Sequence, residues 1–280
     1  MDIQQRTIEK RLYSRQKELI AVIAMLLVLF VVWSPVLNNG FLTNWDDQWM
    51  VTGNPHLLEV THLNAISPEA VATVFTEPYN GQYSPFNTLA YMVIIKAVGM
   101  EPFGFQLFFL LVHLCNFLLV GLVVQKLLGQ MPGIGLKEKT AKVIAWLTAF
   151  LFAVHPMQVE AVAWISASKI PLYSLFYLLG LWFYLRYKEN GRPGTMLLVL
   201  FCFVASLLAK EQAVVFVATL VVVDLAIHTN LKQKKLWLEK IPFVLVEGGS
   251  RSPFRAKGWA AAILWDSVCC LPTTVSGNTW

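Results

Sequence analysis

Residues 103–125 read FGFQLFFLLVHLCNFLLVGLVVQ, an apolar stretch without a charged side chain. A helix that crosses the hydrocarbon core of a bilayer needs about 20 mostly apolar residues, and this stretch provides them. Residues 19–36, LIAVIAMLLVLFVVWSPV, form a second stretch of the same kind. We interpret the second stretch as an uncleaved span, because it is longer than a typical signal-peptide core and no small-residue cleavage site precedes Asn38.

Further apolar stretches continue this pattern along the chain. They lie at residues 143–155, 170–185, 195–209 and 213–228. The predicted fold class is therefore an all-α polytopic membrane protein with about six membrane-spanning helices. Residues 85–98 are also apolar but include Asn87 and Lys96, so we predict an interfacial helix that lies on the outer surface of the membrane.

The density of lysine and arginine alternates between the predicted spans. The segments 1–18, 126–142, 186–194 and 229–240 contain five, four, three and four of these residues, whereas 38–102, 156–169 and 210–212 contain one each. Basic residues favour the cytoplasmic side, so we predict a cytoplasmic N-terminus and a large extracytoplasmic loop at residues 38–102. The pattern fits a bacterial inner membrane and an endoplasmic reticulum membrane equally.

The composition agrees with a membrane class. Of the 280 residues, 56% are hydrophobic and 14% are charged, whereas soluble domains contain about 25% charged residues. The sequence has no glycine-rich phosphate loop, no metal-ligand cluster and no nucleophile elbow, which argues against soluble nucleotide-driven chemistry. We expect no metal and no nucleic-acid partner.

Two parts of the chain differ in pattern. We expect a membrane domain over residues 1–246 and an irregular tail over residues 247–280, where the apolar spans are lost. The tail is either disordered or an aberrant terminus such as a frameshift product. The break falls inside a helical pattern, which favours the second interpretation.

Asp46 and Asp47 form an acidic pair after the first span, within GFLTNWDDQW at residues 40–49. Two adjacent carboxylates near an apolar surface repel each other, and this raises the proton affinity of at least one of them. Such a carboxylate suits a general base that deprotonates a hydroxyl. The alternative is a solvated acidic turn or a helix N-cap, and the spacing alone favours that alternative.

Four more candidates lie on the outer side of the predicted membrane. His155 and Glu160 follow the third span, where Pro156 ends the helix, and they belong either to a site or to an interfacial belt. Lys169 and Lys210 either extend toward lipid headgroups or bind the phosphate of a lipid-linked substrate.

Three polar residues inside the predicted spans favour structural roles. His113 and Asn116 are three residues apart on one helix face, where they are expected to form hydrogen bonds between helices. Asp224 lies in the sixth predicted span, and a buried carboxylate there requires a partner.

Several short motifs follow one another in a set order over residues 38–246. They are NWDD at 44–47, Asn54-Pro55, Ser84-Pro85, Phe103-Gly104, His113 with Asn116, HPMQVEAVAW at 155–164 and LAKEQ at 208–212. In this order they resemble protein O-mannosyltransferase-like proteins of the glycosyltransferase family 39 type. The resemblance is to the branch in which tetratricopeptide repeats follow the membrane domain.

This resemblance implies a glycosyltransferase of the membrane C-type fold. It implies transfer of a mannose-like sugar from a polyprenyl-phosphate donor to a Ser or Thr hydroxyl of an acceptor protein on the extracytoplasmic side. The catalytic carboxylate would be Asp46 or Asp47, with more weight on Asp46. Lys169 and Lys210, helped by His155 and Glu160, would bind the donor. The reaction demands no cofactor, and no feature of the sequence supports a divalent cation.

The chain departs from the family pattern in two places. Many relatives carry Arg-Lys-Asp where this chain has Ser168-Lys169-Ile170, and the later spans and repeats are absent, as in a truncated N-terminal part. One alternative function is a membrane transporter or flippase, which the few polar residues in mid-span disfavour. Another is an inactive membrane fragment with a scaffold role.

Overall fold

The computed structural model describes residues 3–133, 135–227 and 232–249, and this part of the chain is helical. Within it, the only β-type pairing is an isolated bridge between Tyr79 and Gln82. The α-helices are α1 (Ile3–Trp33), α2 (Pro55–Leu63), α3 (Pro68–Thr76), α4 (Pro85–Val98), α5 (Pro102–Gln130), α6 (Glu138–Val154), α7 (Gln158–Ala163), α8 (Lys169–Asn190), α9 (Pro193–Ala209), α10 (Phe216–Ala226), α11 (Lys234–Leu238) and α12 (Ile241–Gly249). Short 3-10 or π-helical turns are η1 (Ser34–Asn38), η2 (Gln48–Thr52), η3 (Ile165–Ser168) and η4 (Glu211–Val215). The all-α prediction is confirmed.

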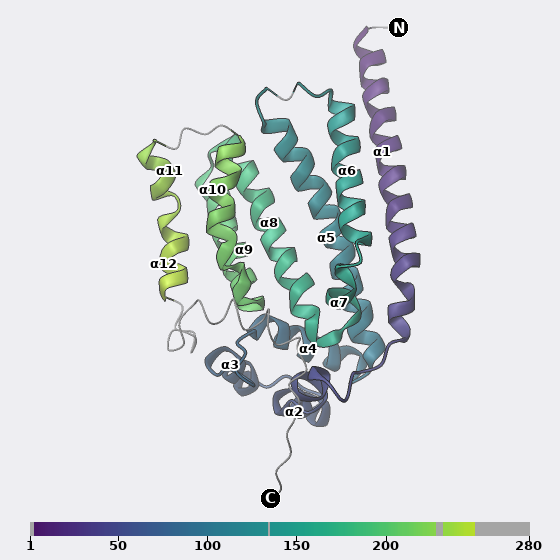
Figure 1. The fold of residues 1–280 in the computed structure, drawn as a ribbon, viewed down its shortest axis with the longest axis vertical. Coiled ribbons are helices and arrows are strands. Elements are labelled where there is room, and N and C mark those ends of the chain that lie inside the picture. Colours follow the sequence, from purple (N-terminus) through teal and green to yellow (C-terminus); the bar gives the residue numbers. More distant parts are fainter. Residues whose placement is uncertain (1–2, 134, 228–231, 250–280) are drawn as a thin grey trace, which may run out of the picture.

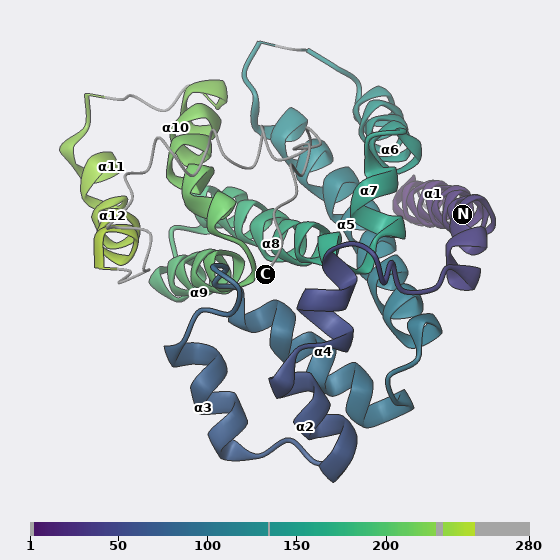
Figure 2. The ribbon, with the colours of Figure 1, turned by 60° about the horizontal axis from the view of Figure 1, so that its bottom comes forward.

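The helices form a bundle with a cap at one end. Helices α1, α5, α6, α8, α9 and α10 run side by side, and the most extensive packing joins α8 to α9 and α5 to both α6 and α8 (Figure 1). Helices α2, α3 and α4 lie across one end of this bundle, and Figure 2 shows that end turned toward the viewer. We refer to these three helices as the cap.

Local sequence signals set where the cap helices begin. Proline occupies the first turn of α2, α3 and α4, where its missing N–H costs no hydrogen bond. The side chain of Asn54 caps α2 by accepting a bond from His56 N at 3.0 Å, and Ser67 caps α3 by accepting one from Ala70 N at 3.0 Å.

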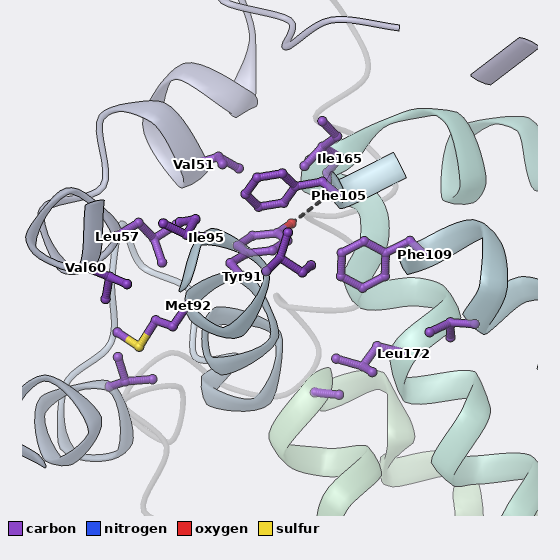
Figure 3. Packing of buried hydrophobic residues seen from close by; sticks show 14 of the residues in the cluster. Val51, Leu57, Val60, Tyr91, Met92, Ile95, Phe105, Phe109, Ile165 and Leu172 are labelled. Atoms are coloured by element: carbon purple, nitrogen blue, oxygen red, sulfur yellow. Dashed lines mark hydrogen bonds between the residues drawn. The ribbon is translucent and has the colours of Figure 1, made fainter. Parts of the chain in front are cut away.

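An aromatic core fastens the cap to the bundle. Tyr91 of α4 packs edge to face against Phe105 and Phe109 of α5, with ring centroids 5.4 and 5.9 Å apart. Aliphatic side chains from α2, α4, η3 and α8 fill the space around these rings (Figure 3). Full burial of one such side chain contributes about 1.5–3 kcal/mol, so this core holds the cap in a fixed position.

Polar contacts between helices match the structural roles predicted for His113 and Asn116. Trp33 Nε1 donates to the carbonyl oxygen of Ala153 at 3.0 Å, and His113 Nε2 lies 3.0 Å from the same oxygen. Asn116 Nδ2 donates to the carbonyl oxygen of Pro171 at 2.9 Å. These bonds join α1, α5, α6 and α8 at buried positions.

Asp224 has the partners that its burial demands. Its carboxylate is fully buried and lies 2.9 Å from Lys188 Nζ and 2.6 Å from Lys240 Nζ. Tyr184 Oη donates to the same carboxylate at 2.8 Å. The predicted pairing of Asp224 is confirmed, and it ties α8 and α10 to the segment before α12.

The structure bears on the predicted spans only in part. Arg15–Asn38 and Pro102–Gln130 are long and apolar enough to cross a membrane. The other predicted spans are helical too, but α6 and α9 have 17 residues each and α10 has 11. The number of six spans and the cytoplasmic N-terminus therefore stay predictions.

Two boundaries can be compared with the sequence analysis. Helix α4 covers the range predicted for the interfacial helix, whose place at a membrane surface stays a prediction. Helix α12 continues to Gly249, three residues past the predicted end of the membrane domain, because the helical pattern that starts at Ile241 continues through Glu247. The rest of the predicted tail, residues 250–280, lies outside the described residues.

Candidate active site

Asp47 is buried and fixed by hydrogen bonds. It is 1% exposed, and its Oδ2 accepts a bond from Leu42 N at 2.9 Å. Its Oδ1 accepts two bonds from Ser166, one from the backbone N at 2.9 Å and one from Oγ at 2.5 Å. These bonds fasten the loop after α1 onto η3.

Asp46, the other member of the pair, is exposed. Among the described residues its carboxylate has no hydrogen bond or ion pair. The two acidic residues therefore differ in what they can do. Asp47 is bonded within the protein, whereas Asp46 is exposed to solvent.

An aromatic pair lies beside Asp46. Trp45, which is 61% exposed, contacts the edge of Trp164, with ring centroids 6.5 Å apart. The indole N–H of Trp164 is buried, and no described residue accepts a hydrogen bond from it. This contact is a second attachment of the acidic loop to the segment between α7 and α8.

A polar pocket lies where the cap meets the start of α8. Its cavity volume is about 20 Å³, and it opens to solvent. Ser166, which holds Asp47, forms part of the pocket wall together with Lys169. The cap and its loops supply the rest: Met50, Asn54, His56, Val74, Glu77, Tyr79, Gln82, Ser84, Pro85, Asn87, Thr88 and Tyr91. The pocket thus lies one residue layer from the anchored carboxylate.

Lys169 is held in this wall by a tight turn of the cap. Its Nζ donates to Gln82 Oε1 at 2.5 Å. Gln82 ends a turn in which Asn80 and Gly81 have φ values of 50° and 74°, and Tyr79 and Gln82 exchange backbone hydrogen bonds of 3.0 and 2.9 Å. Two positive φ values in a two-residue connection define a type I′ turn, which strongly favours Asn-Gly.

Tyr91 fixes the floor of the pocket. Its hydroxyl donates to the carbonyl oxygen of Ile165 at 2.6 Å and lies 2.7 Å from Ser168 Oγ, which in turn donates to Asn87 Oδ1 at 3.4 Å. Burial raises the pKa of the Tyr91 phenol well above its usual range, so the group stays protonated and acts as a donor.

Lys210 lies at the same end of the bundle as Lys169. Helices α8 and α9 are antiparallel, and Ser206 Oγ of α9 donates to the carbonyl oxygen of Tyr173 of α8 at 3.0 Å. Both lysines lie about one turn beyond this contact. Lys210 is 7% exposed, and its Nζ has no hydrogen bond or ion pair within the described part of the chain.

His155 and Glu160 are not part of the pocket. Both are exposed, and His155 Nδ1 accepts a local bond from Met157 N at 3.2 Å. Of the predicted site residues, Lys169 lines the pocket and Asp47 bonds to Ser166 in its wall, whereas Asp46, Lys210, His155 and Glu160 are not among the lining residues. Within the described residues, no group of three or more His, Cys, Asp or Glu side chains is arranged to hold a metal.

Several residues of the pocket have no sequence signal that predicts their role. The sequence alone indicates only that the segment 38–102, which contains His56, Glu77 and Gln82, lies outside the membrane. The Asn80-Gly81 pair is the one local signal that predicts a rigid turn here. No local signal identifies Ser166 as the partner of Asp47.

Over the described residues, these features define a helical protein with two membrane-length helices and a pocket lined by Lys169 and by Ser166, the partner of Asp47. Curated proteins similar to this chain have one name in common. The protein O-mannosyl-transferase Tmtc1 of Drosophila melanogaster is 28% identical over 200 residues, or 71% of this chain and 22% of that protein. The protein O-mannosyl-transferase TMTC1 of Mus musculus is 29% identical over 211 residues, or 68% of this chain and 20% of that protein.

A third relative, the protein O-mannosyl-transferase TMTC4 of Mus musculus, is 30% identical over 160 residues, or 53% of this chain and 22% of that protein. The resemblance predicted from the ordered motifs is thereby confirmed. The chain spans about a fifth of the length of the curated relatives it matches. No family model and no solved structure matches the chain.

Proposed function

We propose that the chain acts as a glycosyltransferase. It would move a mannose-like sugar from a polyprenyl-phosphate donor to a Ser or Thr hydroxyl of an acceptor protein, on the extracytoplasmic side of a membrane. One observation carries the proposal: exposed Asp46 adjoins Asp47, which is anchored to the wall of the pocket that holds Lys169. The similarity to proteins named protein O-mannosyl-transferases supports the same class of reaction.

Asp46 acts as the general base in this mechanism. Its carboxylate accepts the proton of the acceptor hydroxyl as the hydroxyl oxygen forms a bond to the anomeric carbon of the sugar. The bond between that carbon and the phosphate oxygen breaks in the same displacement, which inverts the anomeric configuration. Asp47 is a positioning residue, because its bonds to Ser166 and Leu42 hold the backbone beside Asp46.

The leaving group is a lipid phosphate, which gains negative charge as the bond breaks. Lys169, held at the pocket wall by Gln82, is the cation best placed to stabilise that charge. Lys210 supplies a second cation at the same end of the bundle. His155 and Glu160, exposed outside the pocket, have no part in this mechanism.

The membrane brings the two substrates together. Segments Arg15–Asn38 and Pro102–Gln130 would cross the bilayer, and a polyprenyl chain would lie in the lipid beside them. The cap would then face the aqueous phase in which the acceptor protein is found. Either an endoplasmic reticulum membrane or a bacterial inner membrane meets this requirement.

The direct test is sugar transfer in membranes that contain the full chain. Labelled polyprenyl-phosphate mannose and a Ser/Thr-rich acceptor peptide serve as substrates. Asp46→Asn is expected to lower the transfer rate roughly 100- to 10,000-fold, the range typical of a lost general base. Glu69→Gln, which removes an exposed carboxylate from α3, is the matched control and should leave the rate unchanged.

Two outcomes would contradict the proposal. Absence of transfer by the wild-type chain would overturn the proposed activity. Transfer by Asp46→Asn at the wild-type rate would overturn the role of Asp46 as the base.

A further inference from the structure

A second pocket lies at the end of the bundle opposite the cap. It opens between the C-terminal end of α8, where Tyr187, Lys188 and Gly191 line it, and the segment 233–239 that contains α11 (Figure 1). Its cavity volume is about 200 Å³, compared with about 20 Å³ for the pocket at the cap. One water molecule needs roughly 10–15 Å³ of such a volume, so this second pocket has room for a phosphate group.

The acidic residue in the wall of this pocket is already paired. Glu239 Oε1 accepts a hydrogen bond from Tyr187 Oη at 2.7 Å, and Glu239 Oε2 lies 3.6 Å from Lys188 Nζ. Lys188 Nζ also lies 2.9 Å from the buried carboxylate of Asp224. Both oxygens of Glu239 are therefore engaged, and a lysine balances its negative charge.

Lys235 supplies an uncompensated charge in the same wall. Its side chain is exposed, and neither its Nζ nor the side-chain amide of Gln233 has a hydrogen bond or ion pair with any described residue. Lys234 beside it is exposed as well, which adds to the positive potential at the mouth of the pocket. An ammonium on a flexible stem and a free amide suit a phosphate, because its oxygens accept several hydrogen bonds.

Exposed apolar side chains continue from the pocket along α11 and α12. Trp237 and Leu238 are 52% and 62% exposed, and Val244 and Leu245 of α12 are 53% and 66% exposed. A basic segment flanked by tryptophan and leucine is typical of chain that lies in the headgroup layer of a membrane. The alternation of basic residues predicts that residues 229–240 lie on the cytoplasmic side, where acidic lipids gather.

We propose that this pocket binds the phosphate headgroup of an acidic phospholipid from the leaflet at this end of the bundle. Lys235 pairs with the phosphate oxygens, Gln233 donates a hydrogen bond to them, and the acyl chains lie along the exposed face of α12. A free phosphate would fit the same polar groups but would leave that apolar face uncovered, which favours the lipid. The site is at the opposite end of the bundle from Lys169, so the inference does not rest on the proposed function.

Lipid binding by the full chain in detergent tests this site. Native mass spectrometry gives the affinity for phosphatidic acid, whose headgroup is a bare phosphate, and for phosphatidylcholine with the same acyl chains. The wild-type chain is expected to bind phosphatidic acid more tightly. Lys235→Gln should weaken that binding about tenfold, the loss expected for one hydrogen bond to a charged group, and should leave phosphatidylcholine binding unchanged.

Two further variants sharpen the comparison. Lys234→Gln is the matched control, because Lys234 is an exposed lysine of the same helix that is not among the lining residues, and it should change the affinity for phosphatidic acid little. Glu239→Gln should act in the opposite direction and strengthen binding, because it removes a negative charge from the wall. The unfolding midpoint of each variant verifies its fold.

Several results would overturn the site. Equal losses for Lys234→Gln and Lys235→Gln would mean that diffuse surface charge attracts the lipid without the pocket. Equal affinity of the wild-type chain for the two lipids would exclude selection of an acidic headgroup. Displacement of phosphatidic acid by an equal concentration of inorganic phosphate would assign the pocket to a soluble phosphate. Weaker binding by Glu239→Gln with an unchanged midpoint would exclude an anion as the ligand.

Discussion

Asp47 and Ser166 are 119 residues apart in the chain, yet both donors of Ser166 bond to one oxygen of the Asp47 carboxylate. The backbone N lies 2.9 Å and the hydroxyl oxygen 2.5 Å from Oδ1. This contact fastens the loop after α1 to the turn before α8. It therefore fixes Asp46 relative to Lys169 and explains why only one of two adjacent carboxylates is accessible.

The first prediction separates the roles of the two aspartates. Asp47→Asn should destabilise the fold by about 2 kcal/mol, because hydrogen bonds to a charged acceptor contribute about 1.5–3 kcal/mol. Ser166→Ala should cost about 1 kcal/mol, since the backbone N–H of residue 166 remains a donor. Asp46→Asn should leave the midpoint of thermal unfolding unchanged. Differential scanning fluorimetry of the three variants in detergent measures this, and a lower midpoint for Asp46→Asn than for Asp47→Asn would contradict the assignment.

The second prediction concerns the cation at the pocket wall. Lys169→Gln should lower the rate of sugar transfer by roughly 100-fold, the loss typical when one group that stabilises developing charge is removed. Lys169→Arg should retain more activity, because the positive charge is kept. Gln82→Leu should have an intermediate effect, since it removes the bond that holds Lys169 but not its charge. Initial rates at saturating acceptor peptide give this ranking. A wild-type rate for all three variants would exclude a role for the lysine.

These residues show how far sequence reasoning extends. The apolar runs predict the helices, and the bounds of α4 agree with the predicted 85–98 because Pro85 starts the helix and Gly99 ends it. The need of Asp224 for a partner follows from the cost of burying a charge. The structure shows that the partners are Lys188 and Lys240. Their identity depends on how α8, α10 and the segment before α12 pack together, which the local sequence pattern does not predict.

The pocket was harder to predict for the same reason. Asp46 and Asp47 look equivalent in the sequence, and only the contact with Ser166 distinguishes them. His56 and Glu77 lie on separate elements of the cap, so their approach to Lys169 is a result of tertiary packing. In this pocket only the Asn80-Gly81 pair predicts local structure from sequence, because the positive φ values of a type I′ turn favour Asn and Gly.

A third prediction tests the buried charge cluster at the end of α10. Asp224→Ala should lower stability by about 3–5 kcal/mol, because it leaves Lys188 and Lys240 without their shared counter-ion. Lys240→Met should cost much less, since Asp224 keeps Lys188 and the hydroxyl of Tyr184. Chemical unfolding of both variants compares the two losses. A larger loss for Lys240→Met would mean that this lysine, and not the carboxylate, organises the cluster.

The last prediction concerns Gly81, which has a φ of +74° and space around its Cα for a methyl group. Gly81→Ala therefore meets no steric clash with other residues, but an L-residue in this region of φ and ψ costs about 1–2 kcal/mol. The turn should open to relieve that strain, and this would displace Gln82 from Lys169. We expect a lower unfolding midpoint together with weaker binding of polyprenyl phosphate.

Gly129→Ala is the matched control, because Gly129 lies in α5 with a negative φ and an equally open surrounding. Alanine at this position should stabilise the helix by about 0.5–1 kcal/mol. If Gly81→Ala lowered the midpoint but left lipid binding intact, the turn would serve the fold alone and Lys169 would not depend on it.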